Sequence, residues 1–199
     1  MKKVKLNDEN IHKGYLILIN PDNLLKTNEI KLISYSEKYK NIELDQVANS
    51  QLQKALKSIN ANDEIVPISG VRTFEEQKRL YTDSIIENGE EYTKKFVALP
   101  NASEHQTGLG IDMTSQSVVD KQRLVFGDTT EYKWVVENCA KYGFIVRFTE
   151  GTDGITGISH EPWHLRYVGK KVAKEIKDQN WTLEEYCLYK NVIPKFKKD

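Results

Sequence analysis

A chain of 199 residues, 39% of them hydrophobic, can bury one substantial core but is short for two independent ones, so we expect a single domain over residues 1–199. Its 29 basic and 29 acidic residues balance, which argues against a global field that would recruit nucleic acid or an acidic membrane surface. No segment approaches the roughly 18 apolar residues of a membrane helix, and residues 7–10 are polar where a signal peptide would be apolar. We therefore expect a cytoplasmic protein without a membrane anchor. The sequence makes no prediction of the oligomeric state.

The first half of the chain alternates between strand-like and helix-like patterns. Residues 15–19 are an apolar run closed by Asn-Pro-Asp, which predicts a strand. Apolar residues at helical spacing predict an amphipathic helix over 43–59, and 64–69 predicts a short strand. Thr73 and Glu76 have the capping-box spacing, so a helix is expected to begin there and to end at residues 88–89, Asn-Gly.

The second half predicts a helix over 132–142, ended by Gly143, then a strand over 144–148, a strand over 164–168 and a helix starting at 181–186. The buried side of the first of these helices is expected to hold Val135, Val136, Cys139 and Ala140. Because the strands come in short neighbouring runs and not in a regular βαβ alternation, the pattern favours an α+β fold with an antiparallel sheet.

The residue types at 103–112 and 161–164 are those of a hydrolytic zinc centre. A catalytic zinc takes three protein ligands, usually His and Asp or Glu, and needs a base close to its open position. His105, Asp112 and His164 can be the ligands, and Glu161 can be the base. The two cysteines, Cys139 and Cys187, lie far apart and outside any Cys-x-x-Cys pair, so we expect reduced, partly buried thiols and no cysteine ligation.

Each of these residues has an ordinary alternative when it is considered alone. Asp112 could cap a turn, and Arg72 could be a surface guanidinium. His160 could be a ligand, a residue that supports a ligand by a hydrogen bond, or an ordinary polar residue, and we favour the last two. Glu161 and His164 are three apart, which on a regular strand sends their side chains to opposite faces. We therefore predict a turn or kink at Pro162 that brings Glu161 over the metal.

Three motifs in order carry a resemblance to a known family. They are SGVRT at 69–73 with Gln77 downstream, Ser-x-His-x-x-Gly-x-x-x-Asp at 103–112, and EPWHLRYVG at 161–169. Together they resemble the VanX, VanY and VanXY group of zinc D,D-peptidases, and the intervening residues are most similar to the VanXY type. The resemblance covers about residues 64–187.

The resemblance implies an α+β fold shared with lysostaphin-type peptidases and the Hedgehog domain, with one Zn²⁺ per chain on a central antiparallel sheet flanked by helices. It makes His105, Asp112 and His164 the metal ligands and Glu161 the catalytic base. It places Arg72 at the scissile carbonyl and the developing oxyanion, and it makes Ser103 and Gln77 substrate-binding residues. Two positions depart from the family pattern: Gly110 replaces a common Ala, which we expect to be benign, and His160 replaces a usual aromatic.

The function that the resemblance implies is hydrolysis of the D-Ala-D-Ala dipeptide, of the terminal D-Ala of peptidoglycan precursor pentapeptides, or of both, with a role in vancomycin resistance. The partner would be a small peptide or a peptidoglycan precursor. One alternative is an L,D- or endopeptidase acting on mature cell wall, which would require export. Another is a zinc-containing binding domain without catalysis, against which the spare carboxylate of Glu161 argues.

Overall fold

The computed structural model describes residues 14–26, 31–59, 61, 64–121 and 125–190. Its centre is a four-stranded antiparallel sheet in the order β3-β4-β6-β5. The strands are β3 (Ile65–Ser69), β4 (Gly110–Ser115), β5 (Phe144–Phe148) and β6 (Glu161–Tyr167), and a separate pair is formed by β1 (Leu32–Ser34) and β2 (Glu43–Asp45). The predicted α+β class with a central antiparallel sheet is confirmed.

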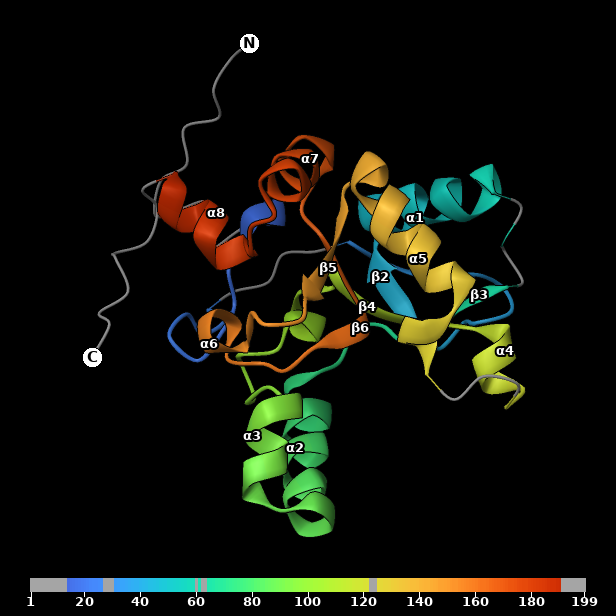
Figure 1. The fold of residues 1–199 in the computed structure, drawn as a ribbon. Coiled ribbons are helices and arrows are strands. Elements are labelled where there is room, and N and C mark those ends of the chain that lie inside the picture. Colours follow the sequence, from blue (N-terminus) through green and yellow to red (C-terminus); the bar gives the residue numbers. More distant parts are fainter. Residues whose placement is uncertain (1–13, 27–30, 60, 62–63, 122–124, 191–199) are drawn as a thin grey trace.

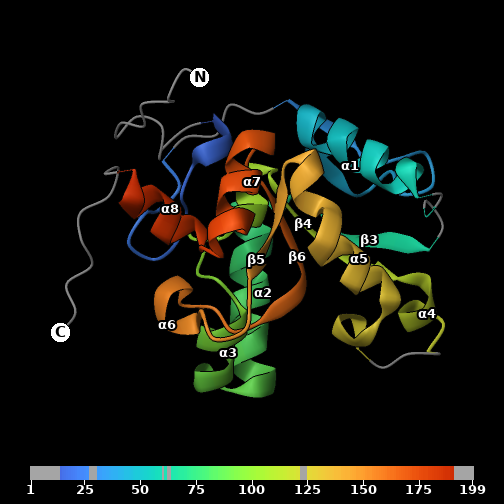
Figure 2. The same ribbon diagram turned by 45° about the horizontal axis from the view of Figure 1, so that its top comes forward.

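The helices flank this sheet on both sides. They are α1 (Gln46–Ser58), α2 (Phe74–Asn88), α3 (Glu90–Phe96), α4 (Gln116–Val119), α5 (Thr130–Asn138), α6 (Asp153–Thr156), α7 (Lys170–Gln179) and α8 (Leu183–Tyr189). In Figures 1 and 2, α2 and α3 lie side by side as a hairpin that projects away from α1, α5 and α7. The hairpin connects the end of β3 to the loop that leads into β4. It therefore lies at the edge of the sheet where β3 ends and β4 begins.

Side-chain caps fix where the main helices begin. The carboxylate of Asp45 accepts hydrogen bonds from the backbone N–H groups of Val47 and Ala48 at 2.9 Å each, and it starts α1. Thr73 and Thr182 each form a complete capping box with the Glu three residues later, at α2 and α8. Such caps pair backbone donors that the first helical turn leaves unpaired. The sequence predictions for these three helices are confirmed to within a few residues.

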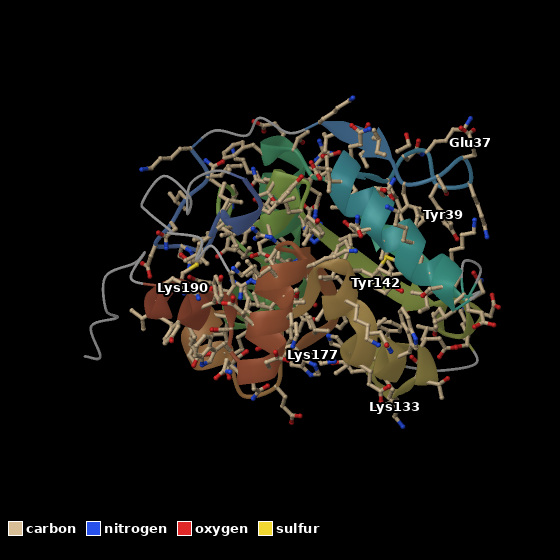
Figure 3. The ribbon with its side chains drawn as sticks, turned by 90° about the horizontal axis from the view of Figure 1, so that it is seen from above. Glu37, Tyr39, Lys133, Tyr142, Lys177 and Lys190 are labelled. Carbon is tan, nitrogen blue, oxygen red and sulfur yellow. The ribbon has the colours of Figure 1, made fainter. Side chains whose placement is uncertain are left out.

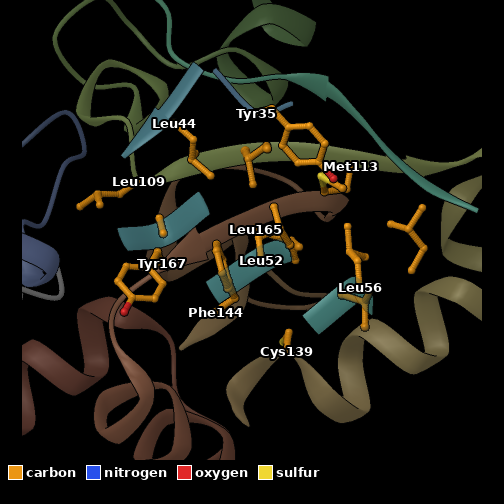
Figure 4. Packing of buried hydrophobic residues seen from close by; sticks show 14 of the residues in the cluster. Tyr35, Leu44, Leu52, Leu56, Leu109, Met113, Cys139, Phe144, Leu165 and Tyr167 are labelled. Atoms are coloured by element: carbon orange, nitrogen blue, oxygen red, sulfur yellow. The ribbon is translucent and has the colours of Figure 1, made fainter. Parts of the chain in front are cut away.

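Alternation along β4 and β6 divides the sheet into an apolar and a polar face. Ile111 and Met113 of β4 are buried beside Leu165 and Tyr167 of β6, and they pack with Leu52 and Leu56 of α1 in the main core (Figure 4). The residues between them must point to the opposite face. Because Asp112 and His164 are direct cross-strand partners, both side chains lie on that polar face.

The predicted strand over 15–19 is wrong. The chain forms a 3-10 turn at Gly14–Leu16 and continues without regular structure, although Ile17, Leu18 and Ile19 are buried. The backbone carbonyls of Tyr15 and Ile17 accept hydrogen bonds from Nη2 of Arg166, at 3.2 and 2.5 Å. The buried guanidinium therefore supplies the hydrogen-bond donors that a neighbouring strand would otherwise supply. The apolar side chains of this segment pack into the two hydrophobic clusters of the protein.

The predicted helix over 132–142 is divided. It consists of α5 followed by a 3-10 turn at Cys139–Tyr142, and Val136 is 43% exposed instead of buried. Lys177 of α7 donates to the carbonyls of Val136 and Glu137 at the end of α5, and the hydroxyl of Tyr142 donates to Ser58 of α1 (Figure 3). These contacts hold the last turn of α5 between α7 and α1.

Among the described residues, no helix is long and apolar enough to cross a membrane. Single-domain organisation over residues 1–199 and a cytoplasmic location stay predictions.

Gly143 gives a test of the fold. It has φ +92° before β5, and a Cβ there would lie 2.7 Å from Cε2 of Tyr167 and 3.0 Å from the backbone nitrogen of Lys170. We expect Gly143→Ala to lower the free energy of unfolding in urea by about 2–4 kcal/mol, from backbone strain and crowding together. Gly154→Ala is the control, since a Cβ there meets no atom within 4 Å. Equal stability of the two variants would contradict the packing at Gly143.

Candidate metal centre and substrate cavity

A tight turn before β4 brings the first predicted ligand to the sheet. Residues Glu104–Thr107 form a 3-10 turn, η2, that ends at Gly108 with φ +67°. The hydroxyl of Thr107 donates to the carbonyl of Glu104 at 2.5 Å and accepts from the N–H of Leu109 at 3.0 Å. The left-handed conformation at Gly108 suits glycine, and it reverses the chain so that His105 in the turn faces Asp112 in β4.

The three predicted metal ligands converge. His105, Asp112 and His164 each offer a ligand atom within 4.8 Å of the others. Nε2 of His105 lies 3.2 Å from Oδ2 of Asp112, and Nδ1 of His164 lies 2.9 Å from Oδ1 of the same carboxylate. Both imidazoles are buried, 3% exposed each.

The other nitrogen of each ring is already committed to a hydrogen bond. Nδ1 of His105 lies 2.6 Å from the carbonyl oxygen of Gly70, and Nε2 of His164 lies 3.3 Å from Oε2 of Glu104. A carbonyl and an ionised carboxylate only accept, so these ring nitrogens carry the protons. The nitrogens that face Asp112 are then the ones available to a metal ion, and a proton or a metal ion between them and the carboxylate makes these contacts favourable. Two imidazoles and one carboxylate are a donor set that suits zinc.

The charges around the group favour a positive centre at this point. Burial alone would lower the pKa of His164, but its hydrogen bonds to Asp112 and Glu104 raise the pKa to about 9. Burial alone would raise the pKa of Asp112, yet the two histidines hold that pKa well below its usual range. The field at the ring nitrogen of His164 therefore stabilises positive charge, whether a proton or a metal ion carries it.

Glu161 and Arg72 lie beside the group. Burial raises the pKa of Glu161 to about 7, against an opposing effect of His164. Nη2 of Arg72 lies 3.8 Å from Oδ2 of Asp112, and Nη1 donates to Oε1 of Gln77 at 2.9 Å. The amide nitrogen of Gln77 donates to the carbonyl of Ala98 at 2.7 Å. Gln77 is thus occupied at both ends and holds Arg72 in place.

Of the predicted turn or kink at Pro162, the turn is wrong, because β6 runs unbroken from Glu161 to Tyr167. Its pairing with β5 is irregular instead. Val146 pairs with Leu165 and Phe148 with Glu161, so Pro162, Trp163 and His164 lie opposite Arg147 alone. Proline has no N–H to donate and is tolerated within a sheet at such irregularities, where the alternation of faces is also broken.

A cavity of about 880 Å³ extends from this group along the α2–α3 hairpin. All seven predicted site residues line it: Arg72, Gln77, Ser103, His105, Asp112, Glu161 and His164. The hairpin contributes Leu80, Tyr81, Ser84, Tyr92 and Phe96 to the wall. The sequence motifs, which extend from residue 69 to residue 169, thus meet at one cavity.

Two further positions of the motifs have different surroundings. His160 is exposed, with Nε2 3.4 Å from the hydroxyl of Tyr132, and it is not part of the cavity wall. Gly110 lies against the ring of His164, where a Cβ would stand 3.2 Å from Cε1 and 3.3 Å from Nε2. An alanine at Gly110 would therefore require a small shift of a ligand ring.

Glu104 is a site residue that the sequence reading missed. It is 3% exposed and bonds His164 directly. The signal for it was indirect: the arginines Arg147 and Arg166 stand within the apolar strand segments 144–148 and 164–168. Buried arginines require carboxylate partners, and Glu104 precedes a predicted ligand in the turn that reaches them.

Comparisons with known proteins identify the family of the chain. The family model described as VanY, D-alanyl-D-alanine carboxypeptidase, matches residues 41–170. The chain is 39% identical over 180 residues to the bifunctional D-Ala-D-Ala dipeptidase and D-Ala-D-Ala carboxypeptidase VanXYC of Enterococcus gallinarum, covering 87% of this chain and 94% of that protein. Other curated relatives are longer, and the chain spans 45%, 61% and 59% of the length of three of them.

Several solved structures match over most of the chain, and two of them show the range of activities. The D,D-dipeptidase VanXYg in complex with a D-Ala-D-Ala phosphinate analogue is 38% identical with a TM-score of 0.83, covering 94% of this chain and 76% of that one. The LD-carboxypeptidase LdcB is 36% identical with a TM-score of 0.77, covering 97% and 94%. The chain belongs to the VanY family of D-alanyl-D-alanine carboxypeptidases.

Proposed function

We propose that the chain is a zinc-dependent D,D-peptidase that releases the terminal D-Ala from the D-Ala-D-Ala dipeptide, from peptidoglycan precursor pentapeptides, or from both. One Zn²⁺ per chain would be held by His105, Asp112 and His164. The observation that carries the proposal is the convergence of two imidazole nitrogens on one carboxylate: Nε2 of His105 lies 3.2 Å and Nδ1 of His164 lies 2.9 Å from the oxygens of Asp112. The bifunctional relative VanXYC, aligned over nearly its whole length, supports the substrate class.

Zinc at this site would supply Lewis acidity and make water an effective nucleophile at neutral pH. Glu161 would take the proton of the attacking water and later deliver it to the leaving amine. Burial suits Glu161 to this exchange, because it raises the pKa of the carboxyl to about 7, and a catalytic acid or base works best with a pKa near the working pH.

Arg72 and Ser103 would bind the substrate. The guanidinium of Arg72 keeps its charge and can donate two hydrogen bonds in parallel, which suits an oxygen that gains negative charge. Its Nε is buried and has no hydrogen-bond partner in the described part of the chain, so one donor is available to a ligand. Ser103 lines the cavity and would contact the terminal carboxylate of the peptide. Gln77, occupied by Arg72 and Ala98, would act on substrate through Arg72.

Removal of D-Ala-D-Ala termini would eliminate the target of vancomycin-type glycopeptides, so we include a resistance role in the proposal. A second candidate is an L,D-carboxypeptidase. The observation that favours it is the 36% identity to the LD-carboxypeptidase LdcB over 97% of this chain. The two candidates share the zinc site and differ in the residue that precedes the cleaved bond.

Glu161→Gln tests the catalytic base. Because the amide cannot accept a proton, we expect kcat to fall by about 100- to 10,000-fold, while the zinc content stays at one per chain. D-Ala release and metal analysis measure the two quantities. Glu150→Gln, at an exposed position outside the cavity wall, is the control. Glu161→Gln with a kcat close to that of the unmodified protein would rule out the assigned role.

Arg72→Lys tests the oxyanion donor. Lysine keeps the charge but loses the planar fork that reaches Gln77 and the cavity together. We expect kcat to fall by about 100- to 1,000-fold, with a smaller change in KM. Arg79→Lys on the exposed side of α2 serves as the control and should leave both constants unchanged. A change confined to KM would instead indicate that Arg72 only binds the ground state.

A panel of three substrates separates the two candidate functions: D-Ala-D-Ala, a pentapeptide ending in D-Ala-D-Ala, and a tetrapeptide ending in L-Lys-D-Ala. We expect D-Ala release from one or both of the first two and none from the tetrapeptide. Release from the tetrapeptide alone would establish the L,D-carboxypeptidase. No release from any of them by the zinc-loaded protein would contradict both candidates.

A further inference from the structure

Four buried charged side chains lie directly behind the metal group. They are Glu104 of η2, Arg147 of β5, Arg166 of β6 and Glu184 of α8, and each is 3% exposed or less. Two carboxylates and two guanidinium groups balance in charge. Burying four ionised groups is unfavourable unless each is paired with good geometry. The pairing within this cluster therefore determines how each carboxylate is oriented.

Glu104 uses its two oxygens for different partners. Oε1 accepts from Nε of Arg147 at 2.8 Å and from Nη1 of Arg166 at 2.7 Å. Oε2 lies 3.3 Å from Nε2 of His164. The two guanidinium groups come from neighbouring strands and fix the orientation of the carboxylate. Its second oxygen is thereby directed at the imidazole.

The ring of His164 needs such a fixed partner. An imidazole turns about its bond to Cβ, and the hydrogen bond at the nitrogen remote from the metal decides which nitrogen binds. The ring also stacks near Phe148, with centroids 5.1 Å apart, and lies against Gly110. These contacts limit the movement of the ring but do not distinguish its two nitrogens, whereas a carboxylate acceptor does.

We propose that Glu104 is a positioning residue for the metal ligand His164: it accepts the Nε2 proton and so presents Nδ1 to the metal, with Arg147 and Arg166 holding it in place. The inference rests on the proposed metal site. It makes metal affinity depend on Glu104 in addition to the three ligands.

Glu184 provides a matched comparison. It accepts from Nη1 and Nη2 of Arg147 at 2.8 and 2.5 Å, and within the described part of the chain it forms no hydrogen bond to His164. Either substitution takes one of the two carboxylate partners from Arg147, and the loss of Glu104 also takes the carboxylate partner of Arg166. Both substitutions should therefore lower stability, Glu104→Gln more than Glu184→Gln, while only the loss of Glu104 removes the hydrogen bond to the ligand.

The experiment compares the zinc dissociation constants of the unmodified protein, Glu104→Gln and Glu184→Gln by competition with a chelator, alongside thermal unfolding of the zinc-free proteins. We expect Glu104→Gln to bind zinc about 10- to 100-fold more weakly, and Glu184→Gln within about threefold of the unmodified protein. Equal weakening in both variants, or none in Glu104→Gln, would overturn the positioning role and leave the proposed function standing. An unmodified protein that binds no zinc would overturn both.

A measurement on the unmodified protein does not depend on whether the variants fold. In ¹⁵N NMR spectra of the zinc-loaded protein, we expect His164 as the Nε2–H tautomer with Nδ1 on the metal, and His105 as the Nδ1–H tautomer with Nε2 on the metal. A proton on Nδ1 of His164 would overturn the inference, because Glu104 would then accept nothing from the ring.

Discussion

Each buried imidazole of the metal group has one nitrogen hydrogen-bonded to an acceptor, which leaves its other nitrogen for a proton or a metal ion. The carbonyl of Gly70 takes the proton of His105, and the carboxylate of Glu104 takes that of His164. The two remaining nitrogens face Asp112, and the cluster favours a positive charge at its centre. The chemistry proposed for Glu161 and Arg72 depends on this positive centre, because both side chains would act on groups bound beside it.

The sheet delivers this geometry through its register. Direct pairing of Asp112 with His164 places two ligands side by side on the polar face, and the turn before β4 adds His105. The irregular pairing between Val146 and Phe148 allows Glu161 to reach the same cavity from the strand that carries His164. The opposite face packs on α1 and gives the site a rigid base. The α2–α3 hairpin then closes one wall of the cavity.

Those features of the fold that depend on local signals could be predicted from the sequence. The capping boxes at Thr73 and Thr182 mark helix starts because the interaction lies within four residues. The ligands could be predicted because their types and spacing form recognisable motifs. The strand prediction for residues 15–19 was wrong because these β-favouring residues are held by long-range contacts. Arg166 donates to the backbone carbonyls of Tyr15 and Ile17, and no local sequence pattern reveals such a partner. Glu104 was missed for the same reason: its partners lie 43 to 62 residues away.

X-ray absorption at the zinc edge of the zinc-loaded protein tests the central claim most directly. The account predicts two imidazole ligands and otherwise oxygen ligands, at about 2.0–2.2 Å, with one zinc per chain. Sulfur at about 2.3 Å, a single imidazole, or failure to bind one equivalent of zinc would contradict the assignment of His105, Asp112 and His164 as the metal ligands.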